Sequence, residues 1–204
     1  MFGVPFERKH RLFVMSGPSG VGKSTVTAEL FRQPEIRGTM DYSVSVTTRP
    51  PRPGETPGES YNFVSPEKFD AMIAAGEFLE WAPVHTSKYG TPHANLDRAH
   101  ADGKDLYLEI DVQGAINVKK AYPDAVLIFL IAPPEVFHDR LVHRPSKLTG
   151  EALAAEIEVR MNTAHRELDA VRFYDYCVMN EKLDECVKTV ISIITAERCH
   201  VPVY

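Results

Sequence analysis

The chain has 204 residues, of which 44% are hydrophobic and 25% charged, and its formal net charge is −5. These totals fit a single soluble globular domain, and the acidic balance argues against broad nucleic-acid binding, so any anion site must be local. The three cysteines form no CxxC pair, and the longest apolar run, AVLIFLIA at 125–132, is too short to span a bilayer. We therefore expect a cytoplasmic protein without membrane contact.

Apolar strands that alternate with helices predict an α/β fold with a doubly wound parallel sheet. The region 40–101 interrupts this alternation and is expected to be an inserted substrate-binding lobe, and 140–171 is expected to be a helical lid. The remaining segments, 1–39, 102–139 and 172–204, would form the core. In chain order, strands are expected at 11–16, 42–48, 61–65, 78–81, 105–111, 125–132 and 176–179, and helices at 23–33, 65–76, 91–101, 135–143, 150–171 and from 183 onward.

A phosphate-binding loop follows the first expected strand. Residues 17–24 read GPSGVGKS, which matches G-x-x-x-x-G-K-[ST] between a strand and a helix. Glycines in such a loop let backbone N–H groups turn toward a phosphate, the lysine reaches the β- and γ-phosphates, and the serine hydroxyl ligates Mg²⁺. This pattern predicts an ATP site made of Gly17, Pro18, Ser19, Gly20, Val21, Gly22, Lys23, Ser24 and Thr25.

A second acidic signal stands at the end of an apolar strand, where the chain reads Glu109-Ile110-Asp111. Ligands of parallel sheets bind outside the carboxyl ends of the strands, so Asp111 is expected to face the phosphates and to hold Mg²⁺ together with Ser24. The alternative is that Asp111 caps the N-terminus of a following helix.

Two arginines in the stretch SVSVTTRPPRPGE, at 43–55, predict a second anion site. The prolines stiffen this segment, and paired guanidinium groups can grip an oxyanion bidentately. Arg49 and Arg52 are thus expected to bind the phosphate of an acceptor nucleotide, with phenol groups from Tyr61 and Tyr89 on the same oxygens. The acceptor would be a nucleoside monophosphate.

The acceptor base is predicted to be guanine. Guanine has donors at N1 and N2 and an acceptor at O6, so a reader needs a carboxylate and hydroxyl groups. Glu80, in the apolar setting FLEWAP, is the candidate carboxylate, and Ser45 and Thr91 are the candidate hydroxyls. Each has an alternative: Glu80 as a solvated charge, and Ser45 or Thr91 as a strand hydroxyl or a helix N-cap.

These motifs together resemble the guanylate kinase family over most of the chain. SVSVTTRPPRPGE, GESYNFVS, EFLEWA, KYGT and EIDVQG occur in the family's order behind the phosphate loop. The resemblance implies ATP-dependent phosphorylation of GMP, with dGMP as a second acceptor, and Mg²⁺ as the cofactor. It also implies that GMP or its phosphate is contacted by Ser45, Arg49, Arg52, Tyr61, Glu80, Tyr89, Thr91 and Asp111, with Glu109 close by.

The resemblance also assigns catalytic arginines in the lid. Arg144 and Arg160 match the family's lid arginines, and Arg140 lies one helical turn before Arg144; with Lys23 and Arg52, Arg144 and Arg160 make up the catalytic set. The segment PSKLTGEALAAEIEV after Arg144 departs from the family's usual lid and is longer. The alternative for Arg140, Arg144 and Arg160 is a solvated helix face with i,i+4 ion pairs, for instance between Glu156 and Arg160. A lid would exclude water, so we expect it to close when both nucleotides bind.

Further interpretations concern the adenine site, the class of protein and the oligomeric state. Asn180-Glu181 resembles the segment near the ATP adenine in this family. A non-catalytic guanylate-kinase-like interaction module is the main alternative, but Lys23 and Ser24 are intact. A GTPase would need an N-K-x-D element, and a kinase for another nucleoside monophosphate fits Glu80 and the two arginines less well. The chain is expected to be a monomer or a homodimer.

Overall fold

The computed structural model describes residues 10–52, 54–84, 86–143 and 149–200. A parallel five-stranded sheet forms the centre, in the order β2 (Met40–Tyr42), β7 (Asp105–Glu109), β1 (Leu12–Ser16), β8 (Val126–Ile131) and β9 (Tyr176–Met179). The inner strands are covered on both faces, which explains why β8 reads as an unbroken apolar run, VLIFLI.

Helices cover both faces of this sheet, which confirms the predicted doubly wound α/β fold. Side chains alternate along β1, so Phe13 and Met15 join one core cluster while Leu12 and Val14 join another. The first cluster includes side chains of α1 (Lys23–Leu30) and α7 (Leu183–Arg198), and the second includes side chains of α3 (His93–Ala101) and α4 (Val112–Ala121).

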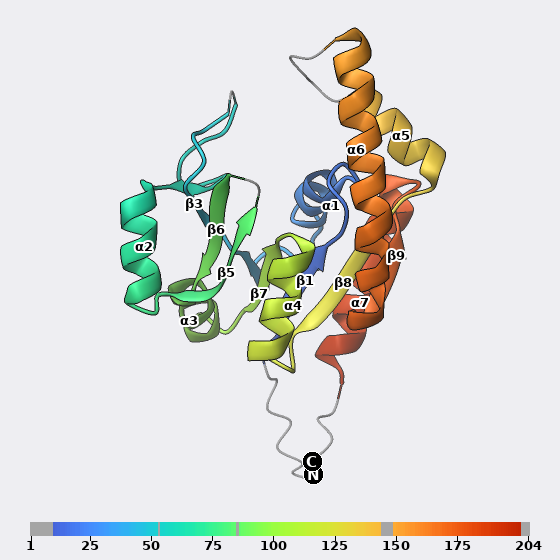
Figure 1. The fold of residues 1–204 in the computed structure, drawn as a ribbon. Coiled ribbons are helices and arrows are strands. Elements are labelled where there is room, and N and C mark those ends of the chain that lie inside the picture. Colours follow the sequence, from blue (N-terminus) through green and yellow to red (C-terminus); the bar gives the residue numbers. More distant parts are fainter. Residues whose placement is uncertain (1–9, 53, 85, 144–148, 201–204) are drawn as a thin grey trace.

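A second sheet of four strands stands beside the central one (Figure 1). Its order is β4 (Asn62–Phe63), β3 (Val46–Thr47), β6 (Ser87–Pro92) and β5 (Phe78–Val84), and α2 (Pro66–Ala74) packs on it through Phe69. The predicted start of α2 is confirmed: Ser65 Oγ accepts a hydrogen bond from the backbone N–H of Lys68, and Pro66 is the first helical residue.

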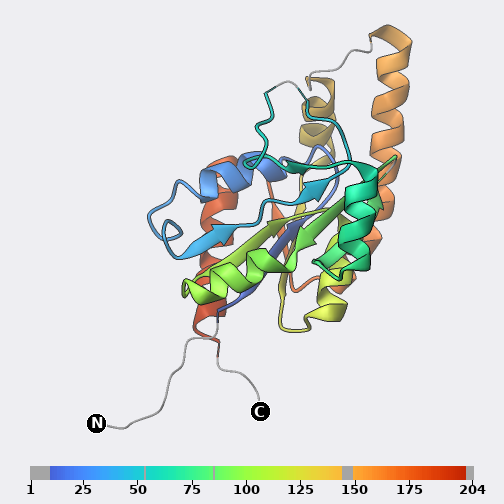
Figure 2. The same cartoon turned by 90° about the vertical axis from the view of Figure 1, so that its left-hand side faces the viewer.

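Two helices follow β8, in the region where a lid is predicted. The helix α5 (Pro134–Val142) leads toward α6 (Gly150–Leu168), which extends beyond the central sheet in both views (Figure 2). A short 3₁₀ helix, η1 (Asp169–Phe173), then returns the chain to β9. The predicted helix at 150–171 therefore ends earlier, at Leu168. Arg144, a predicted catalytic residue, lies outside the described residues.

Several expected elements of the lobe are corrected. The expected strand at 42–48 is two strands, and β2 belongs to the central sheet, so the lobe begins after Tyr42 and not at 40. Leu96 and Ala99 of α3 share a core cluster with Leu106 and Leu108 of β7 as well as with Leu79 of β5, so α3 packs between the two sheets. Thr91 does not cap a helix: it lies in β6, and α3 begins at His93. The strand β6 was not expected from the sequence, and α4 was considered only as the helix that Asp111 would cap.

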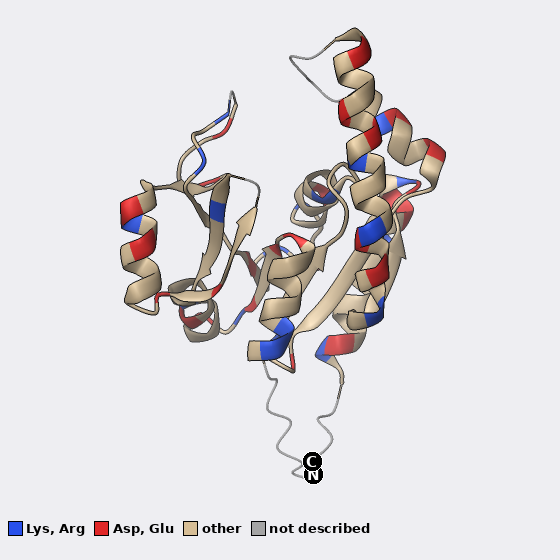
Figure 3. Ribbon diagram, in the orientation of Figure 1, with Lys and Arg blue, Asp and Glu red and all other residues tan. Residues whose placement is uncertain are grey.

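Charged residues are interspersed over both parts of the molecule (Figure 3). Within the described part of the chain, no helix is long and apolar enough to cross a membrane.

A buried ion pair ties the C-terminal helix to the central sheet. The Asp105 side chain has no exposed surface and accepts hydrogen bonds from Arg198 Nε at 2.7 Å and from the Arg11 backbone N–H at 2.9 Å. Arg198 also donates to Thr39 Oγ1 at 2.8 Å. We expect Arg198→Ala to lower the free energy of unfolding by about 3–5 kcal/mol, because it removes a cation that is hydrogen-bonded to a buried carboxylate.

Urea unfolding of Arg198→Ala checks this expectation, with Arg32→Ala as the matched control. Arg32 pairs with Glu29 on the surface, and its side chain is 74% exposed, so its removal should cost less than about 1 kcal/mol. Equal losses in the two variants would contradict the structural role of Arg198.

Candidate active site

The phosphate loop joins β1 to α1 and holds its lysine ready. Lys23 Nζ donates hydrogen bonds to the carbonyl oxygens of Gly17 at 2.6 Å and Pro18 at 3.1 Å. Gly22 has a φ of 98°, and a Cβ there would lie 2.6 Å from Asn180 Nδ2, so only glycine fits this turn. The loop opens on a cavity of about 490 Å³ that is lined by Ser19, Gly20, Gly22, Lys23, Ser24, Thr25, Arg140, Asn180 and Leu183.

The acidic residues at the end of β7 lie beside this loop. Ser24 Oγ donates a hydrogen bond to Glu109 Oε1 at 2.7 Å, so Glu109 contacts a predicted metal ligand. Asp111 is the N-cap of α4, and its Oδ1 accepts from the Gly114 backbone N–H at 2.8 Å. The capping role considered for Asp111 is therefore present. Asp111 nevertheless lines the same cavity as Lys23 and Glu109.

That second cavity, of about 180 Å³, brings together many of the predicted substrate residues. It lies between the central sheet and the lobe. Lys23 of the phosphate loop lines both this cavity and the first one. Its lining includes Ser45 from the start of the lobe. The full set is Lys23, Ser45, Tyr61, Glu80, Val84, Tyr89, Glu109, Ile110 and Asp111.

Glu80 is a buried carboxylate at the floor of this cavity. The residue is only 8% exposed, and its Oε1 accepts a hydrogen bond from Thr91 Oγ1 at 2.8 Å across the β5–β6 pair. Burial, and to a lesser degree the charge of Asp111, raises the pKa of Glu80 to about 7. A Cβ at Gly114 would lie 2.9 Å from Glu80 Oε2, so the glycine lets α4 approach the carboxylate. The solvated-charge alternative for Glu80 is wrong.

The arginines of the lobe are arranged differently from the expected paired grip. Arg49 Nη1 and Nη2 donate to the two carboxylate oxygens of Glu55 at 2.9 and 2.8 Å, and Nε donates to Tyr89 Oη at 3.1 Å. Arg52 is exposed, and its backbone N–H donates to Glu55 Oε2 at 2.7 Å. Tyr61 and Tyr89 lie edge to face, with ring centroids 5.8 Å apart. The Arg49 guanidinium is thus held by Glu55 and Tyr89, whereas Arg52 contacts Glu55 through its backbone.

Two arginines, one on α5 and one on α6, contact the phosphate loop. Arg160 pairs with Glu156 through Nε at 2.9 Å, as the alternative interpretation of this residue proposed, and its Nη1 also lies 3.4 Å from Ser19 Oγ. Arg140 Nη1 donates to the Val21 carbonyl at 2.9 Å. Arg140 was not among the predicted catalytic residues. The sequence signal that could have identified Arg140 as a residue of this site was its position one helical turn before Arg144.

The segment after β9 also contacts the loop. Asn180 is 2% exposed, and its Nδ2 donates to the Val21 carbonyl at 2.9 Å, while its Oδ1 is buried without a hydrogen-bond partner among the described residues. The Glu181 carbonyl oxygen lies 3.5 Å from Arg140 Nη2. Asn180 therefore braces the edge of the cavity at the loop.

Comparison with known proteins decides the family. The family model described as guanylate kinase matches residues 9–197. The chain belongs to the guanylate kinase family. It is 45% identical over 189 residues to a guanylate kinase of Thermus thermophilus, covering 92% of this chain and 82% of the relative. It is 41% identical over 200 residues to that of Clostridioides difficile strain 630, covering 98% and 94%.

A solved structure supports the same assignment to the guanylate kinases. The crystal structure of guanylate kinase from Anaplasma phagocytophilum superposes with a TM-score of 0.76 at 30% sequence identity, and covers 96% of this chain and 89% of that one. The resemblance recognised from the motifs is thereby confirmed.

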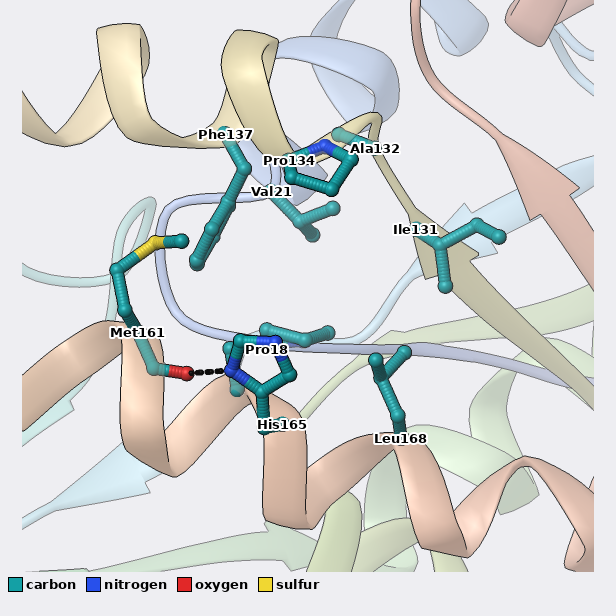
Figure 4. A pocket seen from close by; sticks show the side chains of 10 residues that line it. Pro18, Val21, Ile131, Ala132, Pro134, Phe137, Met161, His165 and Leu168 are labelled. Carbon is teal, nitrogen blue, oxygen red and sulfur yellow. Dashed lines mark hydrogen bonds between the residues drawn. The ribbon is translucent and has the colours of Figure 1, made fainter.

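A third, apolar pocket of this guanylate kinase lies behind the phosphate loop (Figure 4). It measures about 60 Å³ and is enclosed by Pro18 and Val21 of the loop, the end of β8, and the facing sides of α5 and α6. His165 projects from α6 with its Nδ1 2.9 Å from the Met161 carbonyl oxygen, so its ring is tied to its own helix. The pocket is too small for a nucleotide and belongs to the packing of lid against core.

Proposed function

We propose that the protein transfers the γ-phosphoryl group of ATP to GMP, with dGMP as a second acceptor. One observation carries the proposal: Lys23, which would hold the ATP phosphates, lines the same cavity as Glu80, Tyr61 and Tyr89, which would hold the acceptor. The cavity at the phosphate loop would take ATP and the cavity at the lobe would take GMP. Lys23 lines both cavities, which supports a direct transfer between nucleotides bound side by side.

Glu80 is the residue best suited to select guanine. As a carboxylate it can accept hydrogen bonds from guanine N1–H and N2–H, while Thr91 holds the other side of the group through a 2.8 Å hydrogen bond. Ser45 lines the same cavity and offers its hydroxyl to O6. Adenine lacks a donor at N1, so the buried carboxylate would keep only its hydrogen bond from Thr91.

The transfer step needs positioning and charge more than covalent chemistry. Lys23 would leave the Gly17 and Pro18 carbonyls for the β- and γ-phosphates, and the lid arginines Arg160 and Arg140 would add positive charge to the transferring group. Arg144 is proposed for the same role from the family resemblance alone.

Magnesium fits the oxygen atoms beside the phosphate loop. No set of three or more His, Cys, Asp or Glu residues that could hold a metal exists among the described residues, but Ser24 Oγ and Glu109 Oε1 lie together with Asp111 nearby. Mg²⁺ prefers one or two protein oxygens and completes its shell with phosphates and water. We propose Ser24 and Asp111 as its ligands, through oxygen or bridging water; when bound, the ion neutralises charge on the ATP phosphates.

A coupled ADP-release assay with Mg²⁺-ATP tests the proposal against GMP, dGMP, AMP and UMP. We expect the highest kcat/KM for GMP, a measurable value for dGMP, and values at least about 10²-fold lower for AMP and UMP. A higher kcat/KM with AMP or UMP would overturn the assignment of guanine as the acceptor base, while the conclusion that the protein is a nucleotide kinase would stand. Binding of GMP without ADP release would favour a non-catalytic module.

Lid closure is proposed as part of the same cycle. The helix α6 extends beyond the sheet, and Arg160 is bound to Glu156 while only touching the loop at 3.4 Å, so a further approach would bring its charge onto the phosphates. We expect a bisubstrate analogue of ATP and GMP to reduce the radius of gyration measured by solution X-ray scattering, more than GMP alone. An unchanged radius of gyration with the analogue would contradict closure. The active unit is proposed to be a cytoplasmic monomer or homodimer.

A further inference from the structure

The carboxylate of Glu55 organises the arginine loop of the lobe. Its Oε1 accepts from Arg49 Nη2 at 2.8 Å, and its Oε2 accepts from Arg49 Nη1 at 2.9 Å and from the Arg52 backbone N–H at 2.7 Å. The side chains of Arg49 and Glu55 are only 13% and 19% exposed, so this pair is largely shielded from water. The hydrogen bonds from Arg49 hold the pKa of Glu55 below its usual value, which keeps the group ionised at neutral pH.

Counting the donors of Arg49 shows what it can still offer a ligand. A guanidinium group has five N–H bonds. Nη1 donates to Glu55 and to the Pro50 carbonyl at 2.8 Å, Nη2 donates to Glu55, and Nε donates to Tyr89 Oη. Against the described residues, this leaves one N–H on Nη2. The sequence motif suggested a bidentate grip on the phosphate. In this arrangement Arg49 has only one N–H bond left for a ligand, so it cannot bind a phosphate in that way.

The hydrogen bond to Tyr89 has a directional consequence. Because Tyr89 Oη accepts from Arg49 Nε at 3.1 Å, its own hydrogen is free to point elsewhere, and Tyr89 lines the lobe cavity. Tyr61 lines the same cavity, and the Arg49 guanidinium lies 5.4 Å from the Tyr61 ring centroid. One arginine thus sets the positions of two phenol groups, by a hydrogen bond and by a cation–π contact.

We propose that Glu55 is a positioning residue for the phosphate of the acceptor: it fixes Arg49, and Arg49 orients the hydroxyl of Tyr89 toward that phosphate. The inference rests on the proposed function. The donors presented to the phosphate are then Tyr89, Tyr61, the remaining Arg49 N–H and the side chain of Arg52. Glu55 acts on the phosphate end of the acceptor and leaves the base end to Glu80.

Replacing Glu55 with glutamine tests the assignment, with Glu59→Gln as the matched control. Glu59 is exposed and lies in the same loop. The amide cannot accept both Arg49 nitrogens, so we expect the KM for GMP, and the Kd for GMP measured by calorimetry, to rise about tenfold. The Kd for guanosine, which has no phosphate, and the KM for ATP should change less than about twofold, and Glu59→Gln should match wild type. Glu55→Asp, which keeps the charge, should recover part of the loss.

A double-mutant cycle with Tyr89→Phe separates positioning from general damage to the lobe. If Glu55 acts through Tyr89, the double variant should lose little more GMP affinity than Tyr89→Phe alone. Additive losses, an equal loss of guanosine affinity, or an unchanged Kd for GMP in Glu55→Gln would overturn the inference. Calorimetry measures GMP binding and does not require turnover. If the protein binds GMP but releases no ADP, the proposed function is wrong, and the effect of Glu55→Gln on the Kd for GMP can still be measured. If Glu55→Gln fails to fold, Tyr89→Phe decides alone: a selective loss of GMP over guanosine is expected, and no loss refutes the relay.

Discussion

Replacement of Lys23 by alanine is expected to lower kcat about 10³-fold while changing the KM for GMP less than about threefold. Among the described residues, Lys23 is the one side chain that lines both the cavity at the phosphate loop and the cavity at the lobe. Its ammonium group is held by two loop carbonyls at 2.6 and 3.1 Å, which fixes its place before any phosphate arrives. Removing it deletes positive charge where negative charge develops during transfer.

Steady-state kinetics with Mg²⁺-ATP and GMP measure this loss, and Lys120→Ala is the matched control. Lys120 lies exposed near the end of α4, so its removal should leave kcat unchanged. Thermal unfolding of both variants shows whether the loop still folds. A loss of kcat below about tenfold in a folded Lys23→Ala protein would mean that the lysine does not reach the transferring group.

The phosphate loop and the fold class were predictable because their signals are local. GPSGVGKS needs only its own glycines and the start of a helix, and runs such as VLIFLI need only a sheet that is covered on both faces. Ser65-Pro66 predicts a helix start for the same reason, since the cap and the fixed φ of proline act within one turn.

Tertiary contacts decided what the sequence could not. Thr91-Pro92 has the local chemistry of a helix start, but pairing with β5 places Thr91 in a strand, where its hydroxyl meets Glu80. The prediction that Arg49 and Arg52 bind the acceptor phosphate did not include Glu55, whose carboxylate binds Arg49 in the fold. A glutamate three residues after Arg52 was the one available signal, and only the fold shows that it closes on Arg49.

Glu80→Gln is expected to lower kcat/KM for GMP by about 10²-fold and to leave the KM for ATP unchanged. The carboxylate presents acceptors alone, whereas the amide turns one of them into a donor that would face the donors of guanine. IMP lacks the N2 amino group, so the wild-type preference for GMP over IMP should narrow in this variant. Glu77→Gln, at an exposed position just before β5, is the matched control. An undiminished preference for GMP over IMP would assign the base reading to another residue.

The same carboxyl group predicts a pH dependence, because burial raises its pKa from 4.5 to about 7. Only the ionised form accepts from both guanine donors, so the KM for GMP should rise as the pH falls below about 7, by up to about tenfold per pH unit.

The same group should make the folded protein less stable as the pH rises. The folded state binds this proton more tightly than the unfolded chain, so the stabilisation is complete below pH 4.5 and is lost as the pH rises through about 7. Glu80→Gln removes both effects: between about pH 5.5 and 8, at saturating ATP, its KM for GMP should change less than that of wild type, because only the second ionisation of the GMP phosphate (pKa about 6) remains, and its stability relative to wild type should increase over that range. A KM profile of the variant that parallels wild type would place the titrating group elsewhere.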